Sequence, residues 1–373
     1  MEVVEESTQP SEDPAAASRH LADLIGGYQV SAAIGALARL SVADALAEGP
    51  ATAGELALRL GAQGGALARL LEATLDIGLF TLGEDGRYRL TALGNLLRTE
   101  VPGSLRRYAI VSTEDWRWYA FCHLAHTLRT GEPGFMAAYG CRLWDYLASH
   151  PDAASSFEES MTRISAARDQ AIVTSVDFRR FSCVVDVGGG DGGLLRALLR
   201  AYPHLHGILF DLPRVSEGAR ESLEQAGPAG RWEVVAGDFR EAIPQGGDAY
   251  LLSWILHDWD DPAATGILRR CREAMGKGSS LLVVEMVVPE EGRPGADVLR
   301  RLVRQVDLEM LAVVGGRERT AAEFEQLLTA AGFAVVDILP LQGLPWSVIE
   351  ALPVPVPTTL ARYAQIKADR PTT

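Results

Sequence analysis

The amino-acid sequence predicts an α/β fold with a mostly parallel sheet in its C-terminal half, preceded by a helical region. Three observations support this prediction. Beyond residue 180, short apolar runs alternate with helical segments, as in a parallel sheet covered by helices on both faces. A glycine-rich stretch, 188–193, follows the first of these runs and leads into a helical one. Before residue 104, apolar residues recur at the three- and four-residue spacing of a buried helix face.

The chain is long enough for two domains, with 373 residues and 47% hydrophobic content. We divide it into an acidic leader, three folded regions and a tail: 1–16, 17–103, 104–177, 178–351 and 352–373. The leader lacks the basic and apolar parts of a signal peptide, and the longest apolar runs fall far short of the roughly 20 residues of a membrane span. We therefore expect a cytoplasmic protein.

The net charge and the positions of the cysteines limit the classes of partner that the protein can bind. The formal net charge of −14, from 49 acidic and 35 basic residues, repels nucleic-acid backbones and anionic membranes. The four cysteines are widely separated and form no Cys-x-x-Cys pair, which favours reduced thiols over disulfides or a zinc site. We expect a small-molecule partner and neither nucleic acid, membrane nor metal.

The region 17–103 predicts a helical domain that contains a winged helix. Apolar residues recur there at three- and four-residue spacing, which predicts a buried helix face: Leu21, Leu24, Ile25, Tyr28 and later Ile34, Leu37 and Leu40. The segments 53–60 and 65–78 then predict two helices, and 79–90 predicts a hairpin that turns at an Asp-Gly pair. This order of elements is typical of a winged helix.

A winged helix can read DNA or serve as a dimerisation module. The helix that would enter the major groove carries Arg69 against Glu72 and Asp76, whereas phosphate contacts need a basic surface. The sequence therefore favours dimerisation, with a ligand-responsive DNA-binding regulator as the alternative.

The region 104–177 is helical and unusually aromatic. Its rings include Trp116, Trp118, Tyr119, Phe121, Phe135, Trp144, Tyr146 and Phe157. Any single ring at helical spacing is more often part of the core, but a cluster of rings can line a pocket for a flat ligand. As a group they favour an aromatic substrate.

From residue 181 the elements alternate. Strands are predicted at 183–187, 207–210, 232–236, 249–253 and 280–287, and helices at 194–201, 216–225, 262–275 and 320–331. The segments 335–341 and 347–351 predict a closing antiparallel pair. The result is a doubly wound sheet.

The glycine turn after the first strand is a candidate cofactor site. Gly188, Gly190 and Gly193 have the Gly-x-Gly-x-x-Gly spacing, which lets the backbone turn tightly and a ligand approach closely. The spacing alone fits dinucleotides, adenosylmethionine or a purely structural turn.

Carboxylates at the ends of the next strands narrow the choice of cofactor. Asp211, followed by Leu212, ends the second strand, where a carboxylate can bind ribose hydroxyls. The third strand ends in Gly237, Asp238 and Phe239, which offer a carboxylate and a ring for an adenine. Together with Asp186, which precedes the first glycine, they favour S-adenosylmethionine over a nicotinamide cofactor.

The catalytic candidate follows the fourth strand. His257 would project over the cofactor site, because ligands sit beyond the carboxyl ends of parallel strands, and an imidazole can take a proton from a hydroxyl. Glu285 at the end of the fifth strand and Glu318 in a later loop approach the same edge, and one of them would orient the imidazole. The alternatives are a helix-capping histidine and two surface charges.

With these residues in hand, the sequence resembles the plant-type small-molecule O-methyltransferases, typified by caffeic acid O-methyltransferase, and their bacterial natural-product relatives. The resemblance covers roughly residues 20–351 and is carried by the glycine turn and by the strings at 210–213, 237–239, 257–259 and 315–320. It implies a Rossmann-like methyltransferase fold with a mostly parallel seven-stranded sheet and an N-terminal dimerisation domain, in a homodimer that binds S-adenosylmethionine.

The resemblance also implies roles for particular residues. His257 is the general base, flanked by Glu285 and Glu318. Ser253 and Trp254 belong to the cofactor site, and Ser253 replaces a lysine of many plant members. The substrate-binding positions are Trp144, Phe157, Met161, Asp258, Asp307 and Met310.

The implied reaction is transfer of the sulfonium methyl to a phenol or enol oxygen, with S-adenosylhomocysteine as the product. Three alternatives stay open: methylation of nitrogen, a non-methylating reaction such as hydroxylation or rearrangement, and a nicotinamide-dependent oxidation. The sequence does not identify the substrate.

Overall fold

The computed structural model describes residues 13–290 and 296–354. The chain divides into two compact units, 1–118 and 119–373, and the division falls inside the aromatic region 104–177. Each unit is described by itself. Most of the expected leader (1–12) and tail (355–373) lies outside the described residues.

The first unit is mostly helical. Its elements are α1 (Pro14–Arg39), α2 (Val42–Ala47), α3 (Ala53–Leu60), α4 (Gly64–Ala73), β1 (Phe80–Leu82), β2 (Tyr88–Leu90), α5 (Ala92–Asn95) and α6 (Arg106–Val111), and α7 (Asp115–Cys122) leads into the second unit. Helix α1 begins earlier than the sequence indicates, because Asp13 caps it by accepting from the backbone N–H groups of Ala15 and Ala16. Residues 13–16 are therefore part of a folded helix.

The exposed half of α1 contradicts one expectation. Leu21, Leu24, Ile25 and Tyr28, expected to be buried, are 58–65% exposed within this chain, and burial begins only near Leu37. By length and composition alone α1 could cross a membrane, with a mean hydropathy of 1.3 over its most apolar window. The sequence of α1 contains no long continuous apolar run, because polar and small residues separate its apolar residues.

The winged-helix order is present. Thr52 and Glu55 form a capping box that starts α3, and β1 pairs antiparallel with β2 across a turn in which Gly86 has φ +70°. The helix predicted at 65–78 ends earlier, at Ala73, with Thr74 as its C-cap, and the Thr74 hydroxyl donates to the Leu70 and Leu71 carbonyls.

The second unit contains the sheet. Its strands are β3 (Cys183–Val187), β4 (His206–Asp211), β5 (Trp232–Ala236), β6 (Ala249–Ser253), β7 (Ser280–Val288), β8 (Arg319–Thr320), β9 (Phe333–Pro340) and β10 (Trp346–Pro353). Seven of them lie in the order β5-β4-β3-β6-β7-β10-β9, and the short β8 pairs with β7. Only β10 runs antiparallel to its neighbours, so the mostly parallel seven-stranded fold class is confirmed.

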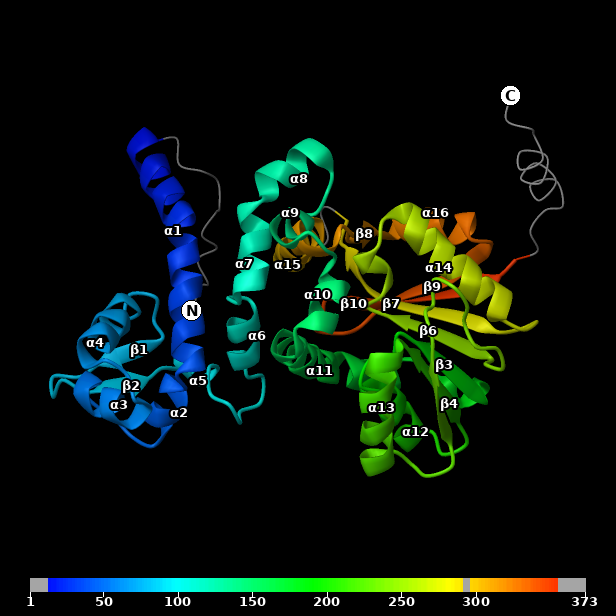
Figure 1. Ribbon diagram of the computed structural model, residues 1–373, viewed down its shortest axis with the longest axis horizontal. Helices are drawn as coiled ribbons and strands as arrows, with labels where there is room; N and C mark the ends of the chain where they lie inside the picture. The colour runs from blue at the N-terminus through cyan, green and yellow to red at the C-terminus, as the bar shows by residue number, and fades with distance from the viewer. Residues whose placement is uncertain (1–12, 291–295, 355–373) are drawn as a thin grey trace, which may run out of the picture. The chain divides into compact units, whose positions relative to one another are not determined.

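Helices cover both faces of this sheet (Figure 1). The helices of the second unit are α8 (Leu124–Thr130), α9 (Gly134–Tyr139), α10 (Leu143–Ser149), α11 (Pro151–Ser175), α12 (Gly193–Ala201), α13 (Pro213–Ala226), α14 (Asp261–Ala274), α15 (Ala296–Glu309) and α16 (Ala321–Ala330), with short turns η1 (Phe178–Arg180), η2 (Leu256–Asp258) and η3 (Met310–Val314). Adjacent strand residues face opposite layers: Val184 packs with α12 and α13, whereas Val185 packs with α14 and α16.

Strands β4, β7, β9 and β10 each run further, at one end or both, than the sequence indicates. Strand β7 continues to Val288, so Glu285 lies inside it and not at its end. Strand β10 includes Leu352 and Pro353, which the sequence assigns to the tail, because both pair with β9.

Candidate active site

The predicted cofactor residues meet at the carboxyl ends of the parallel strands β3 to β6, where open α/β sheets bind their ligands. The turn after β3 has positive φ at Gly188, Gly190 and Gly192 (+74°, +57° and +77°), which only glycine adopts without strain. A Cβ at Gly190 would meet no protein atom within 4 Å, so this glycine leaves open space beside the turn.

Gly193 has a different role from the one implied by its spacing. Its φ is not positive, and a Cβ there would lie 3.2 Å from the carboxylate of Asp169. Gly193 is the first residue of α12, which packs against α11. The third glycine of the pattern therefore serves the close approach of a helix.

Asp211 and Asp186 lie on either side of the turn. The Asp211 carboxylate accepts from the backbone N–H of Gly190 at 2.9 Å and of Leu212 at 2.7 Å, and burial raises its pKa. Asp186 is only 2% exposed, one of its oxygens has no partner, and burial together with the charge of Asp169 raises its pKa to about 7. A buried carboxyl oxygen without a partner is costly unless a ligand donates to it.

The residues after β5 are held by an arginine. Asp238 pairs with Arg240, whose guanidinium lies 5.5 Å from the centre of the Trp259 ring, and Phe239 makes an edge contact with that ring at 6.0 Å. A Cβ at Gly237 would lie 2.6 Å from the Phe210 ring. Asp238 is therefore oriented by an ion pair, and this pair keeps its pKa below the usual range.

The structure adds Arg168 and Asp169, which the sequence analysis missed. Both are buried on α11 and form an ion pair at 3.1 Å. The Arg168 guanidinium lies 5.5 Å from the ring centre of Trp254 and 5.9 Å from that of Trp346, and one of its terminal nitrogens has no partner. Ser253 Oγ and Trp254 Nε1 are likewise buried without partners.

A signal for Arg168 does exist in the sequence. It shares the helical spacing of Ile164, Ala171 and Ile172, which face the core. A charged residue on such a stripe is buried, and a buried charge needs a partner or a ligand.

His257 lies in the turn η2, directly after β6, and is 5% exposed. Its Nδ1 is 2.8 Å from Oε1 of Glu318, and its ring stacks on Trp254 at 5.3 Å. A carboxylate accepts from Nδ1–H, which assigns the proton of the neutral ring to Nδ1 and leaves Nε2 as the proton acceptor. Of the two glutamates, Glu318 therefore orients the imidazole.

Glu285 holds the backbone of the same turn. Ser253 at the end of β6 pairs with Val284, so Glu285 lies one residue beyond the end of β6. Its Oε1 accepts from the backbone N–H groups of Ile255 at 3.0 Å and Leu256 at 2.7 Å. The preceding residue, Trp254, has φ +60°, and these two bonds stabilise that strained turn.

Three buried carboxyl groups determine the basicity of His257. Burial by itself lowers the pKa of the imidazole, but Asp258, Glu285 and Glu318 outweigh burial and raise it to about 10. Burial also raises the pKa of Glu285 to about 7 and that of Asp258 to about 6. The site carries excess negative charge, which favours a cationic ligand.

His257, Glu285 and Glu318 also offer donor atoms within 4.8 Å of one another, as a metal site would. Two ligands of a tetrahedral zinc at about 2.0–2.1 Å lie about 3.3 Å apart. The 2.8 Å between Nδ1 of His257 and Oε1 of Glu318 is shorter than that and fits a hydrogen bond. The geometry favours a hydrogen-bonded pair of His257 and Glu318, here called the dyad, over a metal centre.

The predicted substrate residues fall into two groups. Asp258 Oδ1 lies 3.5 Å from Nε2 of His257, and Met310 begins η3, which packs against η2. Asp307 accepts the backbone N–H of Glu318 at 2.8 Å, so it supports the dyad.

The other group lies on α10 and α11. Trp144 and Phe157 form an edge-to-face pair at 5.8 Å, and Met161 follows Phe157 one turn later. Helix α11 passes the cofactor residues, since its Glu158 pairs with Arg214 near Asp211 and its Arg168 contacts Trp254.

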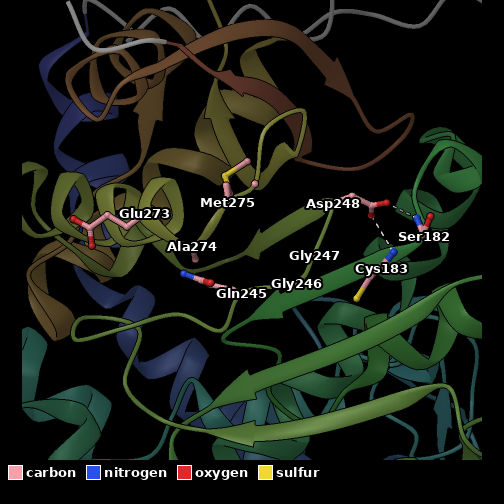
Figure 2. A pocket seen from close by; sticks show the side chains of 10 residues that line it. Ser182, Cys183, Gln245, Gly246, Gly247, Asp248, Glu273, Ala274 and Met275 are labelled. Carbon is pink, nitrogen blue, oxygen red and sulfur yellow. Dashed lines mark hydrogen bonds between the residues drawn. The ribbon is translucent and has the colours of Figure 1, made fainter. Parts of the chain in front are cut away.

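A separate hollow lies at the opposite ends of the strands (Figure 2). Its lining includes Cys183, Asp248 and Met275, at the amino ends of β3, β6 and β7. The Asp248 carboxylate accepts from the backbone N–H of Ser182 at 2.7 Å and of Cys183 at 2.9 Å. The carboxylate oxygens of Asp248 therefore bond to the protein's own backbone. Because the hollow lies at the amino ends of the strands, it is separate from the candidate site.

Comparison with known families gives matches in both units. Residues 121–334 match the O-methyltransferase domain, and residues 22–100 match the O-methyltransferase dimerisation domain.

Three relatives illustrate the similarity. A phenazine O-methyltransferase from Lysobacter antibioticus is 40% identical over 335 residues, which is 90% of this chain and 96% of that protein. An O-demethylpuromycin O-methyltransferase from Streptomyces alboniger is 37% identical, over 94% of this chain and 93% of that one. The crystal structure of an O-methyltransferase from neocarzinostatin biosynthesis, with S-adenosylmethionine and 2-hydroxy-5-methyl naphthoic acid bound, matches 87% of this chain and 96% of that one with TM-score 0.77 and 37% identity.

Other relatives carry out different reactions. An 8-amino-8-demethylriboflavin N,N-dimethyltransferase from Streptomyces davaonensis is 34% identical over 92% of this chain and 97% of that protein. An aclacinomycin 10-hydroxylase from Streptomyces purpurascens is 35% identical over 84% of this chain and 83% of that protein.

Proposed function

The chain belongs to the plant-type O-methyltransferase family and is an S-adenosylmethionine-dependent O-methyltransferase; from this premise we propose that it methylates a hydroxyl of a small aromatic natural product with His257 as the general base. The observation that carries the proposal is the Nδ1–Glu318 hydrogen bond of 2.8 Å, which leaves Nε2 of a buried imidazole to accept a proton.

The residues around the glycine turn fit the cofactor. Asp211 would accept from the ribose hydroxyls, and Asp238 and Phe239 would contact the adenine. The unpartnered guanidinium nitrogen of Arg168 suits the α-carboxylate of the methionine portion. This nitrogen and the unpartnered buried atoms of Asp186, Ser253 and Trp254 gain hydrogen-bond partners when a polar ligand binds beside them.

Bound S-adenosylmethionine supplies an electrophilic methyl on a sulfonium. His257 takes the proton from the substrate hydroxyl at Nε2, while the oxygen forms a bond to the methyl and the carbon–sulfur bond breaks with its electrons going to sulfur. Holding oxygen, methyl and sulfur in line contributes roughly 7 to 11 kcal/mol, and the base contributes about 10² to 10⁴ in rate.

The charge of the site supports this sequence of events. The carboxylates raise the pKa of His257 and so favour its protonated form, whereas a nearby sulfonium opposes them and favours loss of the proton. The imidazole thus becomes a base when the methyl donor is present. Trp144, Phe157 and Met161 offer apolar surface for a flat acceptor.

The exposed apolar face of α1 supports a homodimer. Leu21, Leu24, Ile25 and Tyr28 form an apolar face that the described residues leave largely exposed, at the start of the segment that matches a dimerisation domain. A second copy would bury this face.

The test of the proposed function is incubation with S-[methyl-²H₃]-adenosylmethionine and a panel of hydroxylated naphthoates, phenazines and quinones, followed by mass spectrometry. We expect labelled methyl ethers from at least one class. Label on an amine of an amino-substituted acceptor would replace the proposal with N-methylation, and an oxygenated product without label would replace it with hydroxylation.

Replacing Glu318 with glutamine tests the dyad. The substitution removes one of the charges that raise the pKa of His257, so the imidazole loses its proton at lower pH. Because the free base accepts the proton, turnover rises with pH through the pKa of His257, and this rise shifts to lower pH in Glu318→Gln. We expect the maximal rate to fall about 10- to 100-fold. A pH–rate profile identical to the wild-type profile would contradict the dyad.

A further inference from the structure

We propose that Arg319 is a positioning residue that fixes His257 for proton transfer; this inference rests on the proposed function. Arg319 has no exposed surface and is among the largest fully buried side chains of the described residues. It immediately follows Glu318, the carboxylate partner of His257.

The guanidinium of Arg319 binds the backbone on both sides of His257. Its Nη1 donates to the carbonyl of Leu256 at 2.9 Å, and its Nη2 donates to the carbonyl of Trp259 at 2.8 Å. Both carbonyls belong to the turn that carries His257 and Asp258. The turn is therefore held at its two ends by one planar group.

A carboxylate fixes the guanidinium in turn. Nε and Nη2 of Arg319 both donate to Oδ1 of Asp261, at 2.9 and 2.8 Å. Asp261 is the first residue of α14, so the turn, the helix and the Glu318 loop are joined through one side chain.

The backbone beside Arg319 is fitted to the same turn. The Arg317 N–H donates to the carbonyl of His257 at 2.8 Å. A Cβ at Gly316 would lie 1.9 Å from that carbonyl oxygen, so only glycine allows this approach. Arg319 also pairs with Val287 of β7, the strand that carries Glu285.

These contacts need an arginine. The planar fork of a guanidinium can bind two carbonyls and a carboxylate at fixed angles, whereas a lysine ammonium on a flexible stem cannot hold the same geometry. A displacement of about 1 Å at a reacting group can cost about 10²-fold in rate. Arg319→Lys keeps the charge and removes the fork.

The experiment compares Arg319→Lys with Arg231→Lys in the full chain. Arg231 is a matched control, since its guanidinium also donates to three backbone carbonyls, those of Leu199, Tyr202 and Leu205, remote from the turn. Three properties are measured: turnover, the dissociation constant of S-adenosylhomocysteine by calorimetry, and the His257 titration by NMR with ¹⁵N-labelled histidine, assigned from the spectrum of His257→Ala.

We expect Arg319→Lys to lower kcat about 10- to 100-fold, with S-adenosylhomocysteine affinity within about threefold. The His257 titration shifts to lower pH, because the bond to Glu318 loosens. Arg231→Lys leaves both kcat and the titration unchanged. A wild-type titration and kcat in Arg319→Lys, or equal changes in both variants, would overturn the proposal.

The NMR titration separates this inference from the proposed function. It reports the pKa of the imidazole, which depends on its bond to Glu318, and it needs no turnover. If no acceptor is methylated but the titration still shifts in Arg319→Lys alone, the positioning role stands and the proposed reaction does not.

Discussion

Replacing His257 with alanine is expected to lower turnover by about 10² to 10⁴, with the cofactor dissociation constant unchanged within about twofold. In the proposed mechanism the imidazole accepts the substrate proton, so its removal leaves only orientation to accelerate the reaction. Turnover is measured by the rate of methyl ether formation, and affinity by calorimetry with S-adenosylhomocysteine.

A second histidine serves as control. His204 bonds through Nε2 to the carbonyl of Phe181 at 3.0 Å, at the opposite end of the sheet from the glycine turn. His204→Ala is expected to keep wild-type turnover. If His257→Ala also kept it, the base would have to be removed from the mechanism, and methyl transfer would proceed by orientation alone.

Replacing Asp211 with alanine is expected to weaken binding of S-adenosylhomocysteine about 100-fold. Two hydrogen bonds from ribose hydroxyls to a carboxylate contribute about 1.5 kcal/mol or more each, and each 1.4 kcal/mol is a factor of ten in affinity. The same carboxylate also accepts from the Gly190 N–H, so its loss loosens the turn that we propose to bind the cofactor.

Asp248 provides the matched control. Like Asp211, it accepts two backbone N–H groups, but at the amino ends of the strands (Figure 2). Asp248→Ala and Asp211→Ala should therefore lose similar stability, about 1–3 kcal/mol, in thermal or denaturant unfolding. Only Asp211→Ala should lose cofactor affinity. Equal loss of affinity in both variants would mean that Asp211 acts through the fold and not on the ribose.

Much of the fold follows from local patterns. Strands 183–187, 232–236 and 249–253 are predicted with the bounds that the structure has, because each apolar run is bounded by polar or glycine residues. Apolar residues are buried on both faces of 183–187 and 249–253, whereas the edge strand 232–236 fully buries only Val234. The limits of β7 and β10 are set by pairing with neighbouring strands, and no local pattern encodes this.

The exposed face of α1 shows a second limit. Helical spacing of apolar residues indicates a face suited to burial, as at Leu21, Leu24, Ile25 and Tyr28. It does not indicate which element or partner covers that face. The described chain leaves that face uncovered, and a second copy is the partner that we propose.

By itself, the sequence determined the chemistry that the site can contain: a glycine turn, carboxylates at successive strand ends, and a histidine after the fourth strand. The residue types and their order along the chain are enough for this, since parallel strands bring their carboxyl ends to one edge. Only the tertiary structure decided that Glu318 and not Glu285 bonds to His257, and that Arg168 and Arg319 are buried beside the site. Hydrogen bonds depend on tenths of an ångström, and those of this site join residues up to 63 positions apart. Strand register and turn geometry set such distances, and both are properties of the tertiary structure.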